Sequence, residues 1–242
     1  MALNYNINAD VGEGMGDDTA LMPLIQACNI ACGGHAGSKT EIQKTVELAT
    51  KNNILIGAHP SYPDRKNFGR HSLNLSKESL SQSIEEQLSL LLDQLHLEKL
   101  HHVKPHGALY HDCNSNKEVA KTVLNVIKSK CPNAVIFTPP KSVLGMQALK
   151  MGFIVWAEAF VDRAYQDSGQ LVPRTENDAV LREPKQLFKR FENLIQKKGV
   201  FSINNNWLSL NAKTFCVHGD HPNAAKYLRA VLEHYKKIHS KP

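Results

Sequence analysis

The chain has 242 residues, with 29 Lys and Arg against 23 Asp and Glu, which gives a formal net charge of +6. It is 42% hydrophobic and 21% charged, fractions that are typical of soluble globular proteins and exclude collagen, coiled coils and intrinsic disorder. No stretch approaches the ~18 uninterrupted apolar residues of a membrane span. The N-terminal segment also lacks the apolar core of a signal peptide, so we expect a cytoplasmic protein.

The distribution of the charges argues against nucleic acid as a partner. The pI is about 9.0, but Lys and Arg are spread along the sequence. No RNP, zinc-finger or basic-aromatic pattern occurs. The charge therefore favours anionic small molecules at most, and we expect neither nucleic acid nor a membrane as a partner.

The cysteines predict buried thiols. Their number is odd, no secretion signal precedes them, and Cys28 and Cys32 lack the spacing of most zinc and redox motifs. The five are Cys28, Cys32, Cys113, Cys131 and Cys216.

Seven short apolar or alternating runs predict β-strands. They are Asn4–Asp10, Asn29–Cys32, Ile54–His59, His101–His106, Ala134–Thr138, Ile154–Phe160 and Thr214–His218. Helical patterns separate most of them. The first helix begins with the capping box Ser38-x-x-Glu41, and Ser76 caps a long second helix. Val119–Ile127 and Val143–Met151 continue the alternation.

The last third of the chain adds two helices and an insertion. An apolar stripe over 187–195 predicts a helix that ends at Gly199, and Pro222 opens the last helix. Between them, Val200–Leu210 is typical of a hairpin that turns at Asn204–Asn206.

This alternation of strands and helices predicts an α/β fold with a mostly parallel sheet. Seven units of about 35 residues are close to the size of the units in a (β/α)8 barrel of ~250 residues. We therefore expect one domain over residues 1–242, an irregular seven-stranded β/α barrel. An open doubly wound sheet is the alternative.

Polar side chains follow nearly every predicted strand. In barrels and open α/β sheets the carboxyl ends of the strands form the active site. Six of the seven strands end this way, more than coincidence would give, so we expect a functional site there. The residues are Asn8, Asp10 and Glu13, then His35, His59, Lys104, His106, Glu158, Asp162, Arg163, His218 and Asp220.

The period of two along a strand sharpens this expectation. Asp10 follows Asn8 by two positions, and the same spacing joins Lys104 to His106. In the sixth strand the small apolar residues alternate with Glu158, which places Glu158 on the inner side of the barrel. A buried ionisable group is costly unless it is paired or used.

Two chemistries fit these residues. Asp10, His59, His106 and His218 could hold a divalent metal ion, since carboxylate and imidazole suit Zn, Mn or Fe. A hydrogen-bonded polar network without an ion fits them equally well. Sequence-local metal motifs such as H-E-x-x-H are absent.

In the second chemistry, Asp10 and Glu13 form a general acid/base pair. Lys104 and Arg163 would then bind a substrate carboxylate or phosphate. The alternative for Lys104 is an internal ion pair with Asp10 or Glu158.

Three loops are candidates for ligand contacts. Gly12–Gly16 could cradle a phosphate or simply make a tight turn. His59–His71 and Asp162–Arg174 are longer than typical βα loops, so they are candidate lids. The sequence contains neither a P-loop nor a G-x-S-x-G nucleophile elbow.

Together these segments resemble the LamB/YcsF family. The match covers nearly the whole chain in family order, with Gly34 and Ser61 as small departures. The matching blocks are NADVGEG (8–14), NIACGGHAG (29–37), GAHPSYPD with FGR (57–64, 68–70), HVKPHGALY (102–110), DRAYQDSGQLVPR (162–174) and CVHGDHPNA (216–224).

The resemblance implies a seven-stranded β/α barrel related to glycoside hydrolases and polysaccharide deacetylases. It also implies the opening of the lactam 5-oxo-L-proline to L-glutamate. This reaction consumes ATP with Mg²⁺ in a complex with two further subunits, B and C. Self-association is left open.

On this basis we assign candidate roles. The candidate catalytic residues are Asp10, Glu13, Lys104, His106 and Glu158. The candidate substrate-binding residues are His35, His59, Arg70, Arg163, Arg174 and Asp220. Within these sets, Asp10 or Glu13 would activate water, and the imidazoles would stabilise an oxyanion or bind an ion.

Two other classes of function remain open at this point. A stand-alone metal-dependent amidohydrolase or deacetylase would bind a metal tightly and work without ATP. A non-catalytic subunit would bind 5-oxoproline but tolerate the substitution Asp10→Asn.

Overall fold

The computed structural model describes residues 5–95, 99–219 and 223–239. Seven parallel strands close into a barrel, because the last strand pairs with both the sixth and the first. In order they are β1 (Asn6–Val11), β2 (Ala27–Ala31), β3 (Leu55–His59), β4 (His102–Val103), β5 (Val135–Thr138), β6 (Val155–Phe160) and β9 (Thr214–Cys216). The predicted seven-stranded barrel is confirmed, and the open sheet is wrong.

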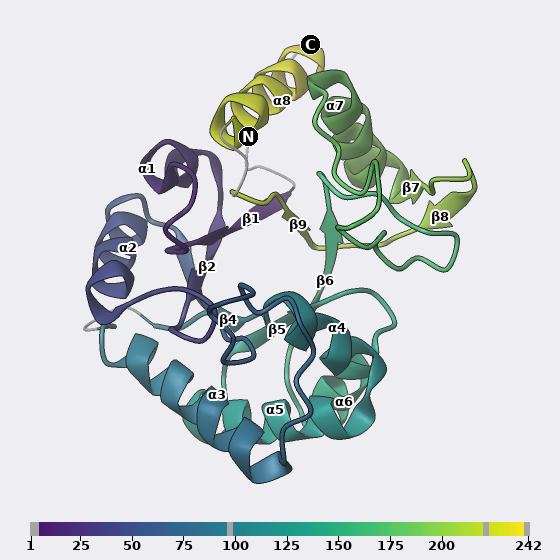
Figure 1. Ribbon diagram of the computed structural model, residues 1–242. Coiled ribbons are helices and arrows are strands. Elements are labelled where there is room, and N and C mark those ends of the chain that lie inside the picture. Colours follow the sequence, from purple (N-terminus) through teal and green to yellow (C-terminus); the bar gives the residue numbers. More distant parts are fainter. Residues whose placement is uncertain (1–4, 96–98, 220–222, 240–242) are drawn as a thin grey trace.

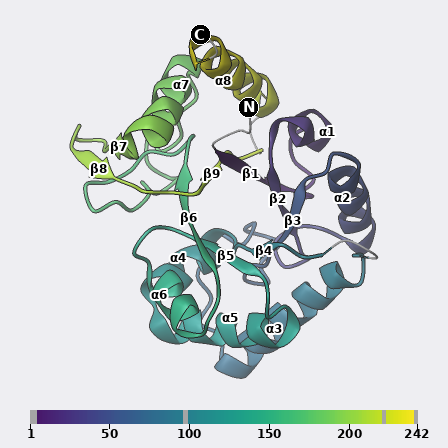
Figure 2. The same ribbon diagram turned by 180° about the vertical axis from the view of Figure 1, so that it is seen from behind.

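Helices surround the ring of strands (Figure 1). They are α1 (Asp18–Leu21), α2 (Lys39–Lys51), α3 (Lys77–Leu92), α4 (Gly107–Ser115), α5 (Lys117–Lys130), α6 (Val143–Lys150), α7 (Pro184–Glu192) and α8 (Ala224–His239), with a short 3-10 helix (Met22–Leu24) and a π-helix (Asn193–Lys197). Seen from behind, α7 and α8 again lie side by side next to β9 and β1 (Figure 2). The rings of Tyr5, Phe191 and Tyr235 pack edge to face there, with centroids 5.1–5.6 Å apart, and cover the place where β9 pairs with β1.

Local capping signals predicted the helix starts well. The Ser38 hydroxyl accepts from the Glu41 N–H at 3.2 Å, and the Ser38 N–H donates to the Glu41 carboxylate at 2.7 Å. Ser76 caps α3 in the same way, by accepting from Ser79 N–H at 3.1 Å. Each cap satisfies an N–H group that has no partner within the helix.

Several predicted ends of strands and helices differ from those in the structure. The fourth strand, predicted over His101–His106, keeps only two residues, and the chain then enters α4, which the sequence analysis missed. Pro105 has no N–H to donate to a ladder. The second strand begins two residues earlier than predicted, at Ala27, and the last ends at Cys216 instead of His218.

The C-terminal helices also differ in detail. Lys198 takes the left-handed conformation that ends the helical segment, so Gly199 begins a strand instead of closing a helix. Pro222 and the predicted start of the last helix lie outside the described residues.

The predicted hairpin is confirmed as β7 (Gly199–Phe201) paired antiparallel with β8 (Trp207–Ser209). It lies outside the barrel, beside α7 (Figure 1). Its turn holds the long loop after β6, because the Ile203 N–H donates to the Tyr165 carbonyl at 2.8 Å and Asn204 donates to Asp167 at 2.9 Å. The insertion therefore braces one wall of the barrel mouth.

The barrel interior changes from apolar to charged along its axis. At the amino ends of the strands, Ala27, Val135, Phe137 and Trp156 form a small apolar cluster. Above it lies a layer of fully buried polar side chains, Asn8, Asn29, His102 and Thr214, joined by hydrogen bonds of 2.8 Å. Ionised groups lie above that layer, at the carboxyl ends. In β1 the outward-facing Ile7, Ala9 and Val11 alternate with the inward-facing Asn8 and Asp10, as the period of two requires.

All five cysteines are buried and free, as predicted. Burial raises the pKa of Cys28 and of Cys32 to about 12, so neither is an accessible nucleophile at neutral pH. Among the described residues, no helix has the length and apolar character needed to cross a bilayer.

The packing of His102 over Gly57 gives a test of the polar layer. A Cβ added at Gly57 would lie 2.1 Å from His102 Nε2, so Gly57→Ala should lower the free energy of unfolding by about 1–3 kcal/mol. In the double variant with His102→Ala the clash is absent, and the loss should be smaller than the sum of the two single losses. Urea denaturation measures all three variants, and strictly additive losses would contradict this packing.

Candidate functional site

A pocket of about 710 Å³ opens at the carboxyl ends of the barrel strands. Its base contains Asp10 and Lys104. Its walls come from α4 and from the two long loops predicted as lids, which contribute residues 67, 68, 70 and 71 and residues 171–174. The volume lies in the range of small-molecule sites. Many of the strand-end residues thus meet in one cavity.

A buried ion-pair cluster lies at the base of this pocket. Lys104 Nζ is 3.1 Å from Asp10 Oδ1 and 3.0 Å from Glu158 Oε1. It also lies 3.1 Å from Cys216 Sγ. The Tyr110 hydroxyl donates to the second oxygen of Glu158 at 2.8 Å. Both internal ion pairs considered for Lys104 are therefore formed.

Electrostatics keep this cluster charged. Burial alone would raise the pKa of Asp10, but His59 and Lys104 outweigh it and hold that pKa well below its usual value. Burial alone would lower the pKa of Lys104, but Asp10, with Cys216 and Glu158, holds it well above its usual value. At neutral pH the carboxylate is ionised and the amine is protonated.

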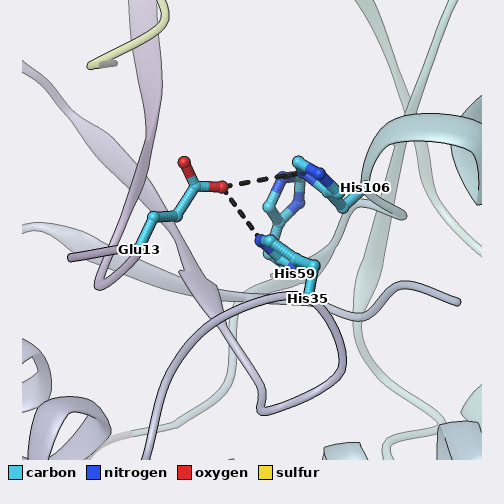
Figure 3. Close-up of side chains that lie close together, drawn as sticks. All are labelled: Glu13, His35, His59 and His106. Atoms are coloured by element: carbon cyan, nitrogen blue, oxygen red, sulfur yellow. Dashed lines mark hydrogen bonds and ion pairs between the residues drawn. The ribbon is translucent and has the colours of Figure 1, made fainter. Parts of the chain in front are cut away.

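Glu13, His35, His59 and His106 gather directly beside the cluster (Figure 3). Glu13 Oε1 lies 3.0 Å from His35 Nε2 and 3.6 Å from His106 Nδ1. The rings of His35 and His106 stack with centroids 3.7 Å apart. Burial lowers the pKa of His106 well below its usual value and that of His35 to about 2, so both imidazoles are neutral.

The glycine-rich loop after β1 positions Glu13. Gly12 and Gly14 have φ angles of +70° and +72°, a backbone conformation that residues other than glycine rarely adopt. The Gly12 N–H donates to Asp18 Oδ2 at 2.8 Å, so it is already engaged within the loop. The loop is the tight turn that the sequence analysis offered as one interpretation, and it directs a carboxylate toward the imidazoles.

The four candidate metal ligands expected from the sequence are divided between two groups of side chains. His59 and His106 lie with Glu13 and His35, and the donor atoms of these four are all within 4.8 Å of one another. Asp10 and His218 instead lie with Cys216. The structure therefore does not bring the donor atoms of Asp10, His59, His106 and His218 together as one group, although Asp10 Oδ2 lies 3.3 Å from His59 Nε2.

His218 is held at the mouth of the barrel by Asp162, another residue at a strand end. Its backbone N–H donates to Asp162 at 2.8 Å, and its Nδ1 lies 3.0 Å from both oxygens of that carboxylate. Burial alone would raise the pKa of Asp162, but His218 outweighs it and lowers that pKa. The His218 ring stacks on Phe160, which fixes it at the edge of the pocket.

The predicted substrate-binding arginines take different places. Arg70 and Arg174 line the pocket. Arg163 lines it as well, but it is buried and its guanidinium donates to the carbonyls of Val172 and Ala179, so it fastens the loop that carries Arg174. Asp220 lies outside the described residues.

Sequence reasoning missed Tyr110 and Cys216 as parts of the site. Cys216 lies between Thr214 and His218 at intervals of two, so its inward orientation was readable from the strand pattern. Tyr110 reaches Glu158 from α4, an unpredicted helix, and only its place in the block HVKPHGALY marked it.

Comparisons with known proteins agree with this architecture. A solved structure entitled lactam utilization protein, from Thermus thermophilus, has a TM-score of 0.90 and 34% sequence identity, and covers 98% of this chain and 97% of its own. A GH18 chitinase from Pseudoalteromonas aurantia, at 9% identity and a TM-score of 0.56, covers 94% of this chain and 99% of its own, and shares the fold alone.

The sequence comparisons are more specific. A protein named as the A subunit of 5-oxoprolinase, from Staphylococcus aureus (strain bovine RF122 / ET3-1), is 36% identical over 238 residues, which are 96% of this chain and 95% of that protein. Residues 5–241 match the profile of the LamB/YcsF family. With that match over nearly its whole length, the chain belongs to the LamB/YcsF family.

Proposed function

We propose that this protein opens the ring of 5-oxo-L-proline to give L-glutamate, acting as the A subunit of a multi-subunit 5-oxoprolinase that consumes ATP with Mg²⁺. Relatives named as the 5-oxoprolinase A subunit and as a lactam utilization protein support this substrate class. The observation that carries the proposal is the buried Asp10–Lys104–Glu158 cluster at the base of a pocket with arginines in its walls. It supplies carboxylates for proton transfer and cations for an anionic substrate.

The parts of the pocket match the two ends of the substrate. 5-Oxoproline has a carboxylate and a lactam amide on one small ring. Arg70 and Arg174 bind the carboxylate, since guanidinium groups bind carboxylates in a bidentate manner. The amide then faces Asp10 and Glu13, one of which removes a proton from the attacking water. Lys104 and the imidazoles stabilise the negative charge that develops on the lactam oxygen before it accepts the phosphoryl group.

The energetics of the ring explain the need for ATP. In the lactam, the amine and the carboxyl group are held together at high effective concentration, so hydrolysis needs an external drive. Transfer of the γ-phosphoryl group of ATP to the lactam oxygen releases ADP and weakens the amide resonance. Water then adds to the ring carbon, the C–N bond breaks to give the free amine and an acyl phosphate, and a second water releases phosphate and leaves glutamate. This sequence has no P-loop, so we assign ATP binding to a site shared with a partner, the B or the C subunit, or to an unconventional site on this chain.

A reconstitution assay tests the proposal first. With ATP and Mg²⁺, we expect glutamate from 5-oxoproline when the purified chain is added to an extract of a host that lacks it, and none from the chain alone. A sample without ATP is the control. No glutamate in the combined sample, with subunits B and C shown to be present, would overturn the proposal. Amide hydrolysis by the chain alone without ATP would instead support the stand-alone amidohydrolase.

Asp10 provides a test of the catalytic cluster. Asp10→Asn keeps the shape of the side chain but removes its charge, so kcat should fall at least about 100-fold, the usual contribution of a general base. Circular dichroism should show a folded protein. The matched control is Asp93→Asn, an exposed position at the end of α3, which should turn over normally. Full activity of Asp10→Asn would leave the chain as a binding subunit only.

The arginines separate binding from chemistry. Arg174→Met should raise KM for 5-oxoproline about 10- to 100-fold, because a hydrogen bond to a charged group contributes about 1.5–3 kcal/mol. The control Arg182→Met removes an exposed guanidinium outside this pocket and should leave KM unchanged. Steady-state kinetics of the reconstituted complex measure both variants. An equal KM in the two would remove Arg174 from the carboxylate site.

A further inference from the structure

Two imidazole nitrogens, His59 Nε2 and His106 Nδ1, lie close together at the mouth of the barrel. His59 Nδ1 lies 2.7 Å from the Lys104 carbonyl oxygen, and His106 Nε2 lies 2.9 Å from the Phe68 carbonyl oxygen. A carbonyl oxygen only accepts, so each of these nitrogens carries the ring hydrogen. When both rings are neutral, the other two nitrogens, His59 Nε2 and His106 Nδ1, are therefore unprotonated, and they lie 3.0 Å apart.

Two carboxylates lie next to these two imidazole nitrogens. Glu13 Oε1 lies 3.6 Å from His106 Nδ1, and Asp10 Oδ2 lies 3.3 Å from His59 Nε2. Two lone pairs and two carboxylates that converge in a buried place repel one another unless a cation lies among them. The cation is either a proton shared by the two rings or a metal ion.

The dimensions and the surroundings favour a metal ion. Ligands at about 2.0–2.1 Å from a tetrahedral ion are separated by about 3.3 Å. The observed separations, 3.0 Å between His59 Nε2 and His106 Nδ1 and 3.6 Å from the latter to Glu13 Oε1, bracket that value. Both rings are also fixed from behind by backbone carbonyls, the usual arrangement around histidine ligands.

We propose that His59 Nε2, His106 Nδ1 and a carboxylate oxygen of Glu13 bind one divalent transition-metal ion of the Zn²⁺ class, with a further position open to the pocket. Two imidazole ligands favour such an ion over Mg²⁺, which prefers oxygen. His35 Nε2, 3.0 Å from Glu13 Oε1, is a positioning residue that donates to the carboxylate. Asp10 adds negative charge, while its other oxygen accepts from Lys104.

The site extends the proposed function without depending on it. All three ligands line the pocket, so an ion there would lie within reach of a bound substrate and could polarise its carbonyl group. The binding can be measured with no lactam, ATP or partner subunit present. If the protein binds no metal, the proposed lactam reaction is unaffected, because the carboxylates can still act as acid and base. If the protein does not open the lactam, the metal-binding proposal is unaffected in the same way.

Cobalt titration of the full-length chain is the test. After removal of metals with a chelator, we expect the protein to bind one Co²⁺ per chain with visible d–d absorption, and Zn²⁺ to displace it. His59→Gln and His106→Gln should weaken binding at least about 100-fold, since even the loss of a partner behind a ligand costs about 10–100-fold. The matched control is His111→Gln, another histidine of the pocket wall, which should bind as the wild type does.

Two outcomes would contradict the proposed metal site. Absence of stoichiometric Co²⁺ and Zn²⁺ binding would show that a shared proton occupies the point between the rings, and the proposal would be wrong. Equal binding by the wild type and both histidine variants would place the ion elsewhere and overturn it too. Circular dichroism checks each variant. If the histidine variants fail to fold, Glu13→Gln, in the loop after β1, decides between loss and retention of the ion.

Discussion

The buried ammonium group of Lys104 is the constraint on which the rest of the site depends. A single positive charge inside a barrel is tolerated only if carboxylates and other polar groups reach it from several sides. Asp10 arrives from β1, Glu158 from β6 and the Cys216 thiol from β9, all at 3.0–3.1 Å. These strands meet only because the barrel closes between β6, β9 and β1, so the ion-pair cluster is complete only in the closed barrel.

The graded interior gives the barrel a functional direction. Aromatic and aliphatic side chains fill its amino-terminal end, a hydrogen-bonded layer follows, and charged groups occupy the mouth. Each layer supports the one above it: the Asn29 amide donates both to Asn8 and to Asp10 at 2.8 Å, and thereby orients the carboxylate from below. Water and substrate therefore meet the cluster from the pocket side, while the polar layer fixes its geometry from the other.

The pocket combines two sets of groups that do different work. The Lys104 cluster is held by ion pairs and hydrogen bonds, which suits charge stabilisation and proton transfer. Beside it, backbone carbonyls hold the rings of His59 and His106, and His106 presents its Nδ1 toward Glu13. The long loops complete the walls, and the hairpin of β7 and β8 anchors the loop after β6, so an insertion far from the chemistry helps to place Arg174.

The sequence by itself determined the barrel class, most strands and helix caps, and the inward residues at the strand ends, because periodicity and capping are local properties of the chain. It could not determine which of those inward residues touch. Glu13 reaches His106 only through a turn with two left-handed glycines, and His218 is drawn away from His59 by Asp162. Such pairings depend on distances between strands that are far apart in sequence. Only the closed barrel sets those distances, and it decided that Glu13 lies with His59 and His106, while Asp10 contacts both His59 and Lys104.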